Sequence, residues 1–243
     1  MTFKEKVEQE LKDLTRKQKV AFAWRCAIRA LPILGNKGAF DFWEETDRQK
    51  HLHSIFFALD ASAAYVVAVT AFVYAAATPY AAVAAAASAS AAAYTAAYAA
   101  DTAAYADAAA YTAAYAADTA YASAAADASC YARDVAEAAD AADAIDATAK
   151  RMNIDLEQMI LEDLKAIKNN QQPKISILLY GEIWDDFQTA LKKEGCEYWG
   201  VLYQDLFNND FALDQEALER RINVPKEIKA QGAAAVGRYL EEI

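Results

Sequence analysis

Few residues of this chain have the types and spacing that could do chemistry. His51 and His53 are its two histidines, and on a helix their imidazoles would point about 200° apart, so they cannot chelate one metal ion. The cysteines Cys26, Cys130 and Cys196 include no pair with the spacing of a zinc or disulfide motif. No G-x-S-x-G serine motif and no glycine-rich phosphate loop occur. We expect no catalytic residue, no metal and no cofactor, and a chain that is not an enzyme unless a partner completes its site.

Acidic and aromatic side chains are the better candidates for a binding role. One acidic stripe recurs every third residue, which is typical of a solvated helix face and also suits a basic partner. An adjacent acidic pair follows Trp184, and because neighbouring residues do not share a helix face, it is also typical of a helix start. The candidate partner-binding residues are Asp140, Asp143, Asp146, Asp185, Asp186, Trp199 and Tyr203.

The charge balance restricts the kind of partner. The chain has 243 residues and a formal net charge of −11, with 35 acidic and 24 basic residues. Residues 1–50 are mildly basic, whereas residues 51–243 carry a net charge of −14. An acidic body repels phosphates, so we expect no nucleic acid partner. A basic protein partner fits this charge, and so does a simple role in solubility.

The chain's cysteines and its first residues bear on its location. Three widely spaced cysteines fit a reducing compartment better than a disulfide framework. The chain is charged from its fourth residue and shows no apolar signal core. We expect a cytoplasmic protein.

The elements that must position these residues are helices. No glycine occurs between Phe40 and Tyr180, and much of that stretch consists of Ala, Tyr, Thr and Asp. Alanine has the highest helix propensity. The sequence predicts an all-α fold, with an alanine- and tyrosine-rich helical bundle with long central helices over residues 1–168. A small aromatic-rich helical module follows over residues 169–243.

A repeat within the alanine-rich tract indicates how it packs. The motif Tyr-Thr-Ala-Ala-Tyr-Ala-Ala-Asp-Thr-Ala begins at Tyr94 and again at Tyr111. A shift of 17 residues leaves the second copy rotated by about 100° on a straight helix. The tyrosines therefore wrap the helix, which favours a core contacted from several sides over one flat face.

Capping residues and apolar periodicity give the helix boundaries. Thr2 to Leu14 should be a helix with Phe3, Val7, Leu11 and Leu14 on one face. Thr15 and Gln18 should form a capping box for a second helix that ends near Pro32. A third helix should begin near Thr46 or Asp47 and run towards Ala77. Asp155 should cap a helix that runs to about Ile167, and a short extended segment should follow from Ile175 to Tyr180. Two helices are then expected, one from Trp184 to Lys193 that closes at Gly195 and one from Glu197 to Asn208. Asp214 should cap a short helix through Arg221, and a last helix should open at Pro225 with soft interruptions at Gly232 and Gly237.

Two segments resemble known bacterial families. The run Ala23-Trp-Arg-Cys-Ala-Ile-Arg-Ala-Leu-Pro-Ile-Leu34, then Arg48-Gln-Lys-His-Leu52 and the alanine-rich tract, resembles a family of immunity proteins found beside polymorphic toxins. This resemblance covers roughly residues 20–150. The segment from Glu197 to Phe207, with Pro225-Lys-Glu and Gln231-Gly-Ala-Ala-Ala-Val, resembles a module at the ends of uncharacterised bacterial proteins, some of them in conflict systems. Both resemblances imply binding and not turnover.

These observations predict a non-enzymatic binding protein of the immunity or defence class. Its acidic helical surface would engage a basic toxin or effector, as in toxin–antitoxin or antiviral systems. One alternative is a structural or ice-binding protein, because alanine-rich helices can serve that role. Another is a membrane-associated protein, because residues 61–100 carry no charge; alanine and tyrosine dilute that signal, so we expect a buried bundle helix there.

Overall fold

The computed structural model describes residues 2–41, 43–67, 157–169, 171, 180–209 and 212–243. These residues form α-helices and one short 3-10 helix, and no β-strand occurs among them. The predicted all-α class is therefore confirmed. The repeated tyrosine motif, the helix start at Asp155 and the extended segment before Tyr180 lie outside the described residues.

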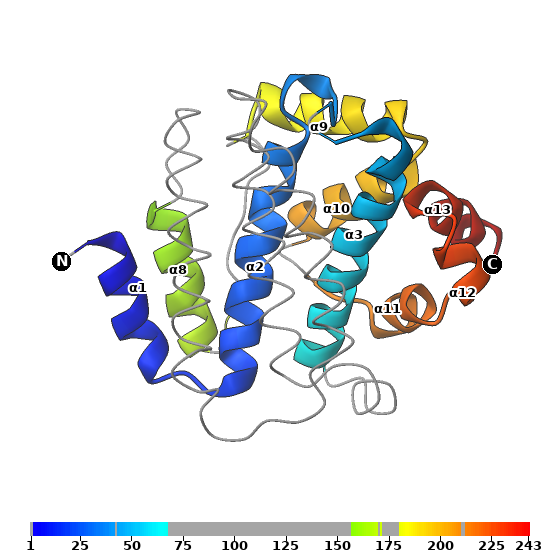
Figure 1. Ribbon diagram of the computed structural model, residues 1–243. Helices are drawn as coiled ribbons and strands as arrows, with labels where there is room; N and C mark the ends of the chain where they lie inside the picture. Colours follow the sequence, from blue (N-terminus) through cyan, green and yellow to red (C-terminus); the bar gives the residue numbers. More distant parts are fainter. Residues whose placement is uncertain (1, 42, 68–156, 170, 172–179, 210–211) are drawn as a thin grey trace.

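Four helices lie side by side in the N-terminal part of the fold (Figure 1). They are α1 (Phe3–Lys12), α8 (Glu157–Lys168), α2 (Arg16–Leu34) and α3 (Glu45–Val67). In that order each helix packs against the next. The α8 helix, far away in the sequence, thus lies between the first two helices of the chain.

The C-terminal helices cover α2 and α3. The helix α9 (Glu182–Lys193) packs across one end of α2 and against the 3-10 turn η1 (Asn36–Gly38) (Figure 1). The next helix, α10 (Glu197–Asn208), packs on α9 and has the bounds that the sequence predicts.

Three shorter helices complete this part. They are α11 (Gln215–Ile222), α12 (Lys226–Lys229) and α13 (Ala233–Glu242). Both α11 and α13 pack against α3, and α12 packs against α13. Residues from the end of the chain therefore lie next to the third helix.

The first two helices follow their sequence signals closely. Phe3, Val7, Leu11 and Leu14 are all buried, as the apolar spacing predicts. Thr15 accepts a hydrogen bond from the Gln18 backbone N–H, and the Gln18 side chain bonds back to the Thr15 N–H, so the predicted capping box is present. Thr2 and Glu5 form a second box, which we did not predict.

The second helix passes through its proline and ends close to it, as predicted. Pro32 lies inside the last turn of α2, which ends at Leu34 with Gly35 as its cap. Proline has no N–H to donate to the Ile28 carbonyl, so the turn before Pro32 lacks one helix hydrogen bond. The Gly35 N–H donates to the Pro32 carbonyl at 3.2 Å and closes the turn.

Most of the later helix ends also agree with prediction, and one differs. Gly195 adopts a φ of 67° after α9, and the side chain of Asp214 caps α11. The helix expected to open at Pro225 is instead two helices, α12 and α13. Gly232 separates them with a φ of 100°, a left-handed conformation that stops a helix, whereas Gly237 lies inside α13. The predicted soft interruptions were wrong at both glycines, because the helix is broken completely at Gly232 and continues through Gly237.

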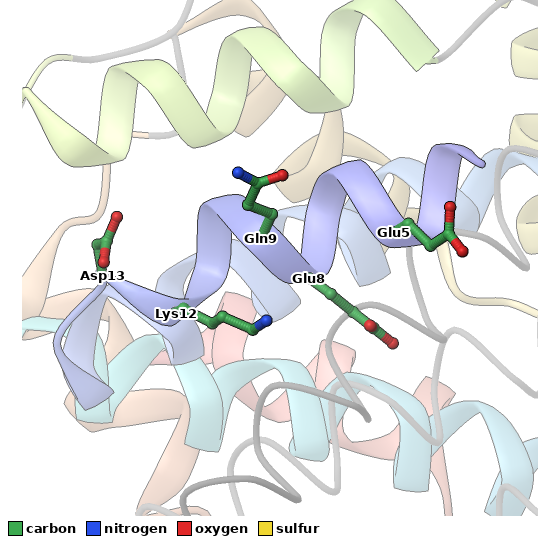
Figure 2. Close-up of a pocket in the computed structure, with 5 residues that line it drawn as sticks. All are labelled: Glu5, Glu8, Gln9, Lys12 and Asp13. Atoms are coloured by element: carbon green, nitrogen blue, oxygen red, sulfur yellow. The ribbon is translucent and has the colours of Figure 1, made fainter. Parts of the chain in front are cut away.

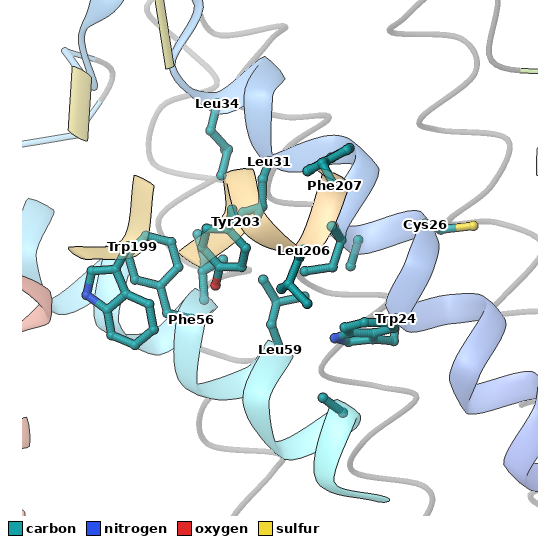
Figure 3. Close-up of a cluster of buried hydrophobic side chains, with 14 of the residues drawn as sticks. Trp24, Cys26, Leu31, Leu34, Phe56, Leu59, Trp199, Tyr203, Leu206 and Phe207 are labelled. Carbon is teal, nitrogen blue, oxygen red and sulfur yellow. The ribbon is translucent and has the colours of Figure 1, made fainter. Parts of the chain in front are cut away.

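Most of the buried apolar side chains of the described residues form one cluster. Phe56 and Leu59 of α3 meet Tyr203 and Leu206 of α10 in this cluster (Figure 3). The cluster thus contains residues from both sides of the predicted domain boundary after residue 168.

Gln49 of α3 connects three segments by hydrogen bonds. Its Nε2 donates to the Glu194 carbonyl at 2.8 Å, and its Oε1 accepts from the Ala234 N–H at 2.9 Å. One side chain therefore joins α3 to the end of α9 and to the start of α13.

The described helices include none that is both long enough and apolar enough to cross a membrane. Most of the uncharged stretch over residues 61–100 lies outside that part of the chain.

Candidate functional site

The predicted acidic pair begins α9, and its two members have different surroundings. Asp185 is exposed. Asp186 is half-buried, and its Oδ2 accepts a hydrogen bond of 2.9 Å from the backbone N–H of Lys37. Lys37 has a φ of 66°, which is unfavourable for a residue with a side chain. Asp186 thus stabilises a strained turn of this chain, and Asp185 is the more exposed of the two.

The two aromatic candidates lie in the core. Trp199 and Tyr203 are each only 2% exposed and lie one turn apart on α10 (Figure 3). The Trp199 ring stacks on Phe56 at a centroid distance of 4.5 Å, and its indole Nε1 donates to the Ala233 carbonyl at 2.9 Å. In this structure Trp199 and Tyr203 are buried, and their contacts join α10 to α3 and α13. The acidic stripe Asp140, Asp143 and Asp146 lies outside the described residues.

A surface hollow beside α1 gathers acidic side chains that the sequence did not single out. It has a volume of about 560 Å³ and is lined by Glu5, Glu8, Gln9, Lys12 and Asp13 (Figure 2). The first four recur at i, i+3, i+4 and i+7, so the helix places them along one side. Among the described residues that line this hollow, three carboxylates face one ammonium group, which is an excess of negative charge. The signal was available, because these residues lie opposite the apolar face that the sequence did predict.

A different side of α1 is occupied by ion pairs with α8. The Lys6 Nζ lies 3.1 Å from Glu157 Oε1, and Lys168 bonds to Glu10. Lys6 and Glu10 lie one turn apart on α1, so the two pairs hold this helix against α8.

Two buried ion pairs were also missed by the sequence analysis. The Arg29 Nε of α2 donates to Asp163 Oδ2 of α8 at 2.7 Å, and both side chains are at most 1% exposed. The Arg221 Nε of α11 donates to Asp60 Oδ1 of α3 at 2.9 Å. Each of these ion pairs is buried and joins two helices. We therefore assign both pairs a role in holding the fold together.

The described thiols are buried. Burial raises the pKa of the Cys196 thiol to about 12 and raises that of Cys26 even further. A thiol is nucleophilic as the thiolate, so these two groups are unreactive at neutral pH.

The two histidines contact different aromatic rings. His51 lies 5.2 Å from the Trp43 ring and His53 lies 6.0 Å from the Phe57 ring, measured between centroids. Burial lowers the pKa of both imidazoles, that of His53 to about 4. Among the described residues, no group of three or more His, Cys, Asp or Glu side chains is placed to hold a metal ion.

Comparison of the chain with protein-family models, with curated proteins and with solved structures found no match.

Proposed function

We infer that this chain acts by binding another protein, and that the acidic side of α1 is part of the contact. The acidic hollow is the observation that carries this proposal, because it places Glu5, Glu8 and Asp13 around one concave surface. Such a surface attracts lysine and arginine side chains, and complementary charge speeds association and favours the correct partner.

The surroundings of α1 support this role. Its apolar face is buried and its Lys6 and Glu10 are paired with α8, so the helix is held firmly on the scaffold. The Glu5 carboxylate accepts a bond of 2.7 Å from the Thr2 N–H, which fixes its position. A fixed carboxylate loses little conformational freedom when a basic side chain binds.

The partner we propose is a basic toxin or effector, with this chain as its immunity or defence factor. The acidic surface and the resemblance over roughly residues 20–150 support this class. A toxin or nuclease encoded beside this chain's gene would identify the candidate. Co-expression of the two proteins should then restore the growth of cells that the toxin alone arrests, and a failure to restore growth would count against the immunity role.

Binding measurements on the purified pair test the proposed contact surface. The double variant Glu8→Gln/Asp13→Asn removes two carboxylates from the hollow but leaves the capping residue Glu5 in place. Exposed charges contribute modestly, so we expect its Kd to rise about two- to thirtyfold at low salt. The same loss of affinity should appear in the unchanged chain as the salt concentration rises, because ions screen such contacts.

The matched control is Asp205→Asn/Glu241→Gln, which makes the same change in charge at exposed positions on α10 and α13. It should leave the Kd almost unchanged. Equal effects of the two double variants would show that only net charge matters. Binding that ignores both the salt and the α1 variant would exclude this surface as the contact.

A further inference from the structure

One side of α3 forms a small cluster with α11 and α12 that contains His53. His53, Phe57 and Asp60 recur at i, i+4 and i+7, so they lie on one side of the helix. The His53 and Phe57 rings are stacked, with an interplanar angle of 23°. The Lys229 Nζ of α12 lies 4.8 Å from the centroid of the same Phe57 ring. An imidazole and an ammonium group thus share one aromatic neighbour.

Lys229 also closes the connection between α11 and α12. Its Nζ donates to the Ile222 carbonyl at 2.6 Å, at the end of α11. The Lys229 side chain therefore links α12 to the end of α11 and also contacts the Phe57 ring of α3. Displacement of Lys229 would loosen both contacts at once.

No described negative charge close to His53 would stabilise the protonated imidazole. On α3, Lys50 lies one turn before His53, and Asp60 lies two turns after it with its carboxylate bonded to Arg221 of α11. The α12 turn contributes Lys229 as a half-buried cation, whereas Lys226 and Glu227 are both exposed. From α13, which also packs on α3, the charged groups Arg238, Glu241 and Glu242 are exposed. Within the described part of the chain, Lys229 is the charged group whose field acts on His53.

We propose that His53 and Lys229 form an acid-sensitive latch, which holds α11 and α12 against α3 while His53 is neutral and releases them when it is protonated. A proton on the imidazole places a second cation beside the Phe57 ring and repels Lys229. The latch acts on the C-terminal helices and is independent of the acidic surface on α1.

The direction of the pH effect follows from linkage. Burial, followed by the charge of Lys229, lowers the pKa of His53 from its ordinary 6.5 to about 4. A released His53 takes up a proton more readily than a latched one, so acid favours release. The stability of the latch is fully present above about pH 6.5 and is lost as the pH falls towards about 4. Between about pH 7.5 and pH 5 these pKa values give an increase in the opening constant of about 30-fold.

Hydrogen exchange followed by mass spectrometry tests the latch. After correction for intrinsic exchange rates, the opening constant of amides in α11 and α12 should rise about 30-fold between about pH 7.5 and pH 5, and that of α2 amides should stay nearly constant. The variant His53→Phe keeps an aromatic ring and should abolish this rise. The matched control His51→Phe removes the other histidine and should retain it. An undiminished rise in His53→Phe, or an equal rise in α2, would overturn the proposal.

A second measurement needs no change at His53. The NMR titration of its imidazole should give a pKa well below 6.5 in the unchanged chain. In Lys229→Gln, which keeps a hydrogen-bond donor but loses the charge, that pKa should move upwards. A normal pKa in the unchanged chain, or no movement in Lys229→Gln, would show that the two residues are not coupled.

Discussion

Asp60 on α3 accepts a hydrogen bond from Arg221 on α11, although the two residues are 161 positions apart and both are buried. Burial raises the pKa of the Asp60 carboxyl, and the Arg221 guanidinium partly offsets this effect. Burial alone would lower the pKa of Arg221, and the Asp60 carboxylate reverses this so that it is raised. The pair therefore depends on both members, because either charge left alone in the core would be poorly solvated.

Removing one member of this pair should destabilise the fold strongly. Arg221→Met leaves the Asp60 carboxylate buried without its partner, and we expect a loss of about 3–5 kcal/mol in the free energy of unfolding. Urea denaturation followed by circular dichroism measures it. The exposed pair Lys50–Asp47 provides the control, since Lys50→Met should cost no more than about 1 kcal/mol. A small effect at Arg221 would mean that water reaches Asp60.

Two buried tyrosines should respond oppositely to the same substitution. The Tyr180 hydroxyl donates to the Arg29 carbonyl at 3.0 Å, whereas the Tyr203 hydroxyl has no hydrogen-bond partner among the described residues. Tyr180→Phe removes this buried hydrogen bond and should cost about 0.5–1.5 kcal/mol. Tyr203→Phe removes an unsatisfied hydroxyl and should leave stability unchanged or raise it by about 1 kcal/mol. Thermal denaturation of both variants checks this, and a costly Tyr203→Phe would reveal a bond that the structure does not show.

At position 35 a glycine is needed because Phe187 lies too close for a side chain, and not because of the backbone angles. A Cβ at this position would lie 2.4 Å from the Phe187 Cα, so α9 would have to move away from the end of α2. Gly35→Ala should therefore cost about 3 kcal/mol or more. At Gly181 a Cβ would meet nothing within 4 Å, but its φ is 49°. Gly181→Ala should cost about 1–2 kcal/mol from conformation alone, and similar costs in the two variants by urea titration would contradict the close approach.

The two described thiols should be protected in the folded chain. In a Cys130→Ser background, Cys26 and Cys196 should react very slowly with a thiol reagent at neutral pH, because both are buried and their pKa values are raised. Two equivalents should react at once after denaturation in urea. Fast reaction of either thiol in the native chain would indicate that its region opens.

The sequence predicted those features that depend on neighbouring residues. The bounds of α10, the cap at Asp214 and the buried face of α1 follow from local periodicity and capping chemistry. Gly232 was recognised as a weak point, but its positive φ and its close approach to Gln49, where an added Cβ would lie 2.6 Å from the Gln49 Cβ, were not predicted.

The buried ion pairs depend on residues far apart in the chain, and the sequence did not reveal them. Nothing local to Arg29 indicates that Asp163, 134 positions later, accepts its hydrogen bond. Trp199 and Tyr203 were chosen as partner-binding candidates, but an aromatic residue that packs in a core and one that binds a partner have the same local pattern. The acidic side of α1 was visible as the complement of its apolar face.

The hydrogen bonds of Gln49 have a consequence for the synthesis of the chain. Ala234 lies 185 positions after Gln49, so at about 5–20 residues per second the ribosome needs on the order of 10–40 seconds to deliver its partner. During that time the faces of α2 and α3 that α9 to α13 later cover remain open, including Phe56 and Leu59. The nascent chain is then a substrate for holding chaperones, and slowing translation after residue 67 should increase its aggregation.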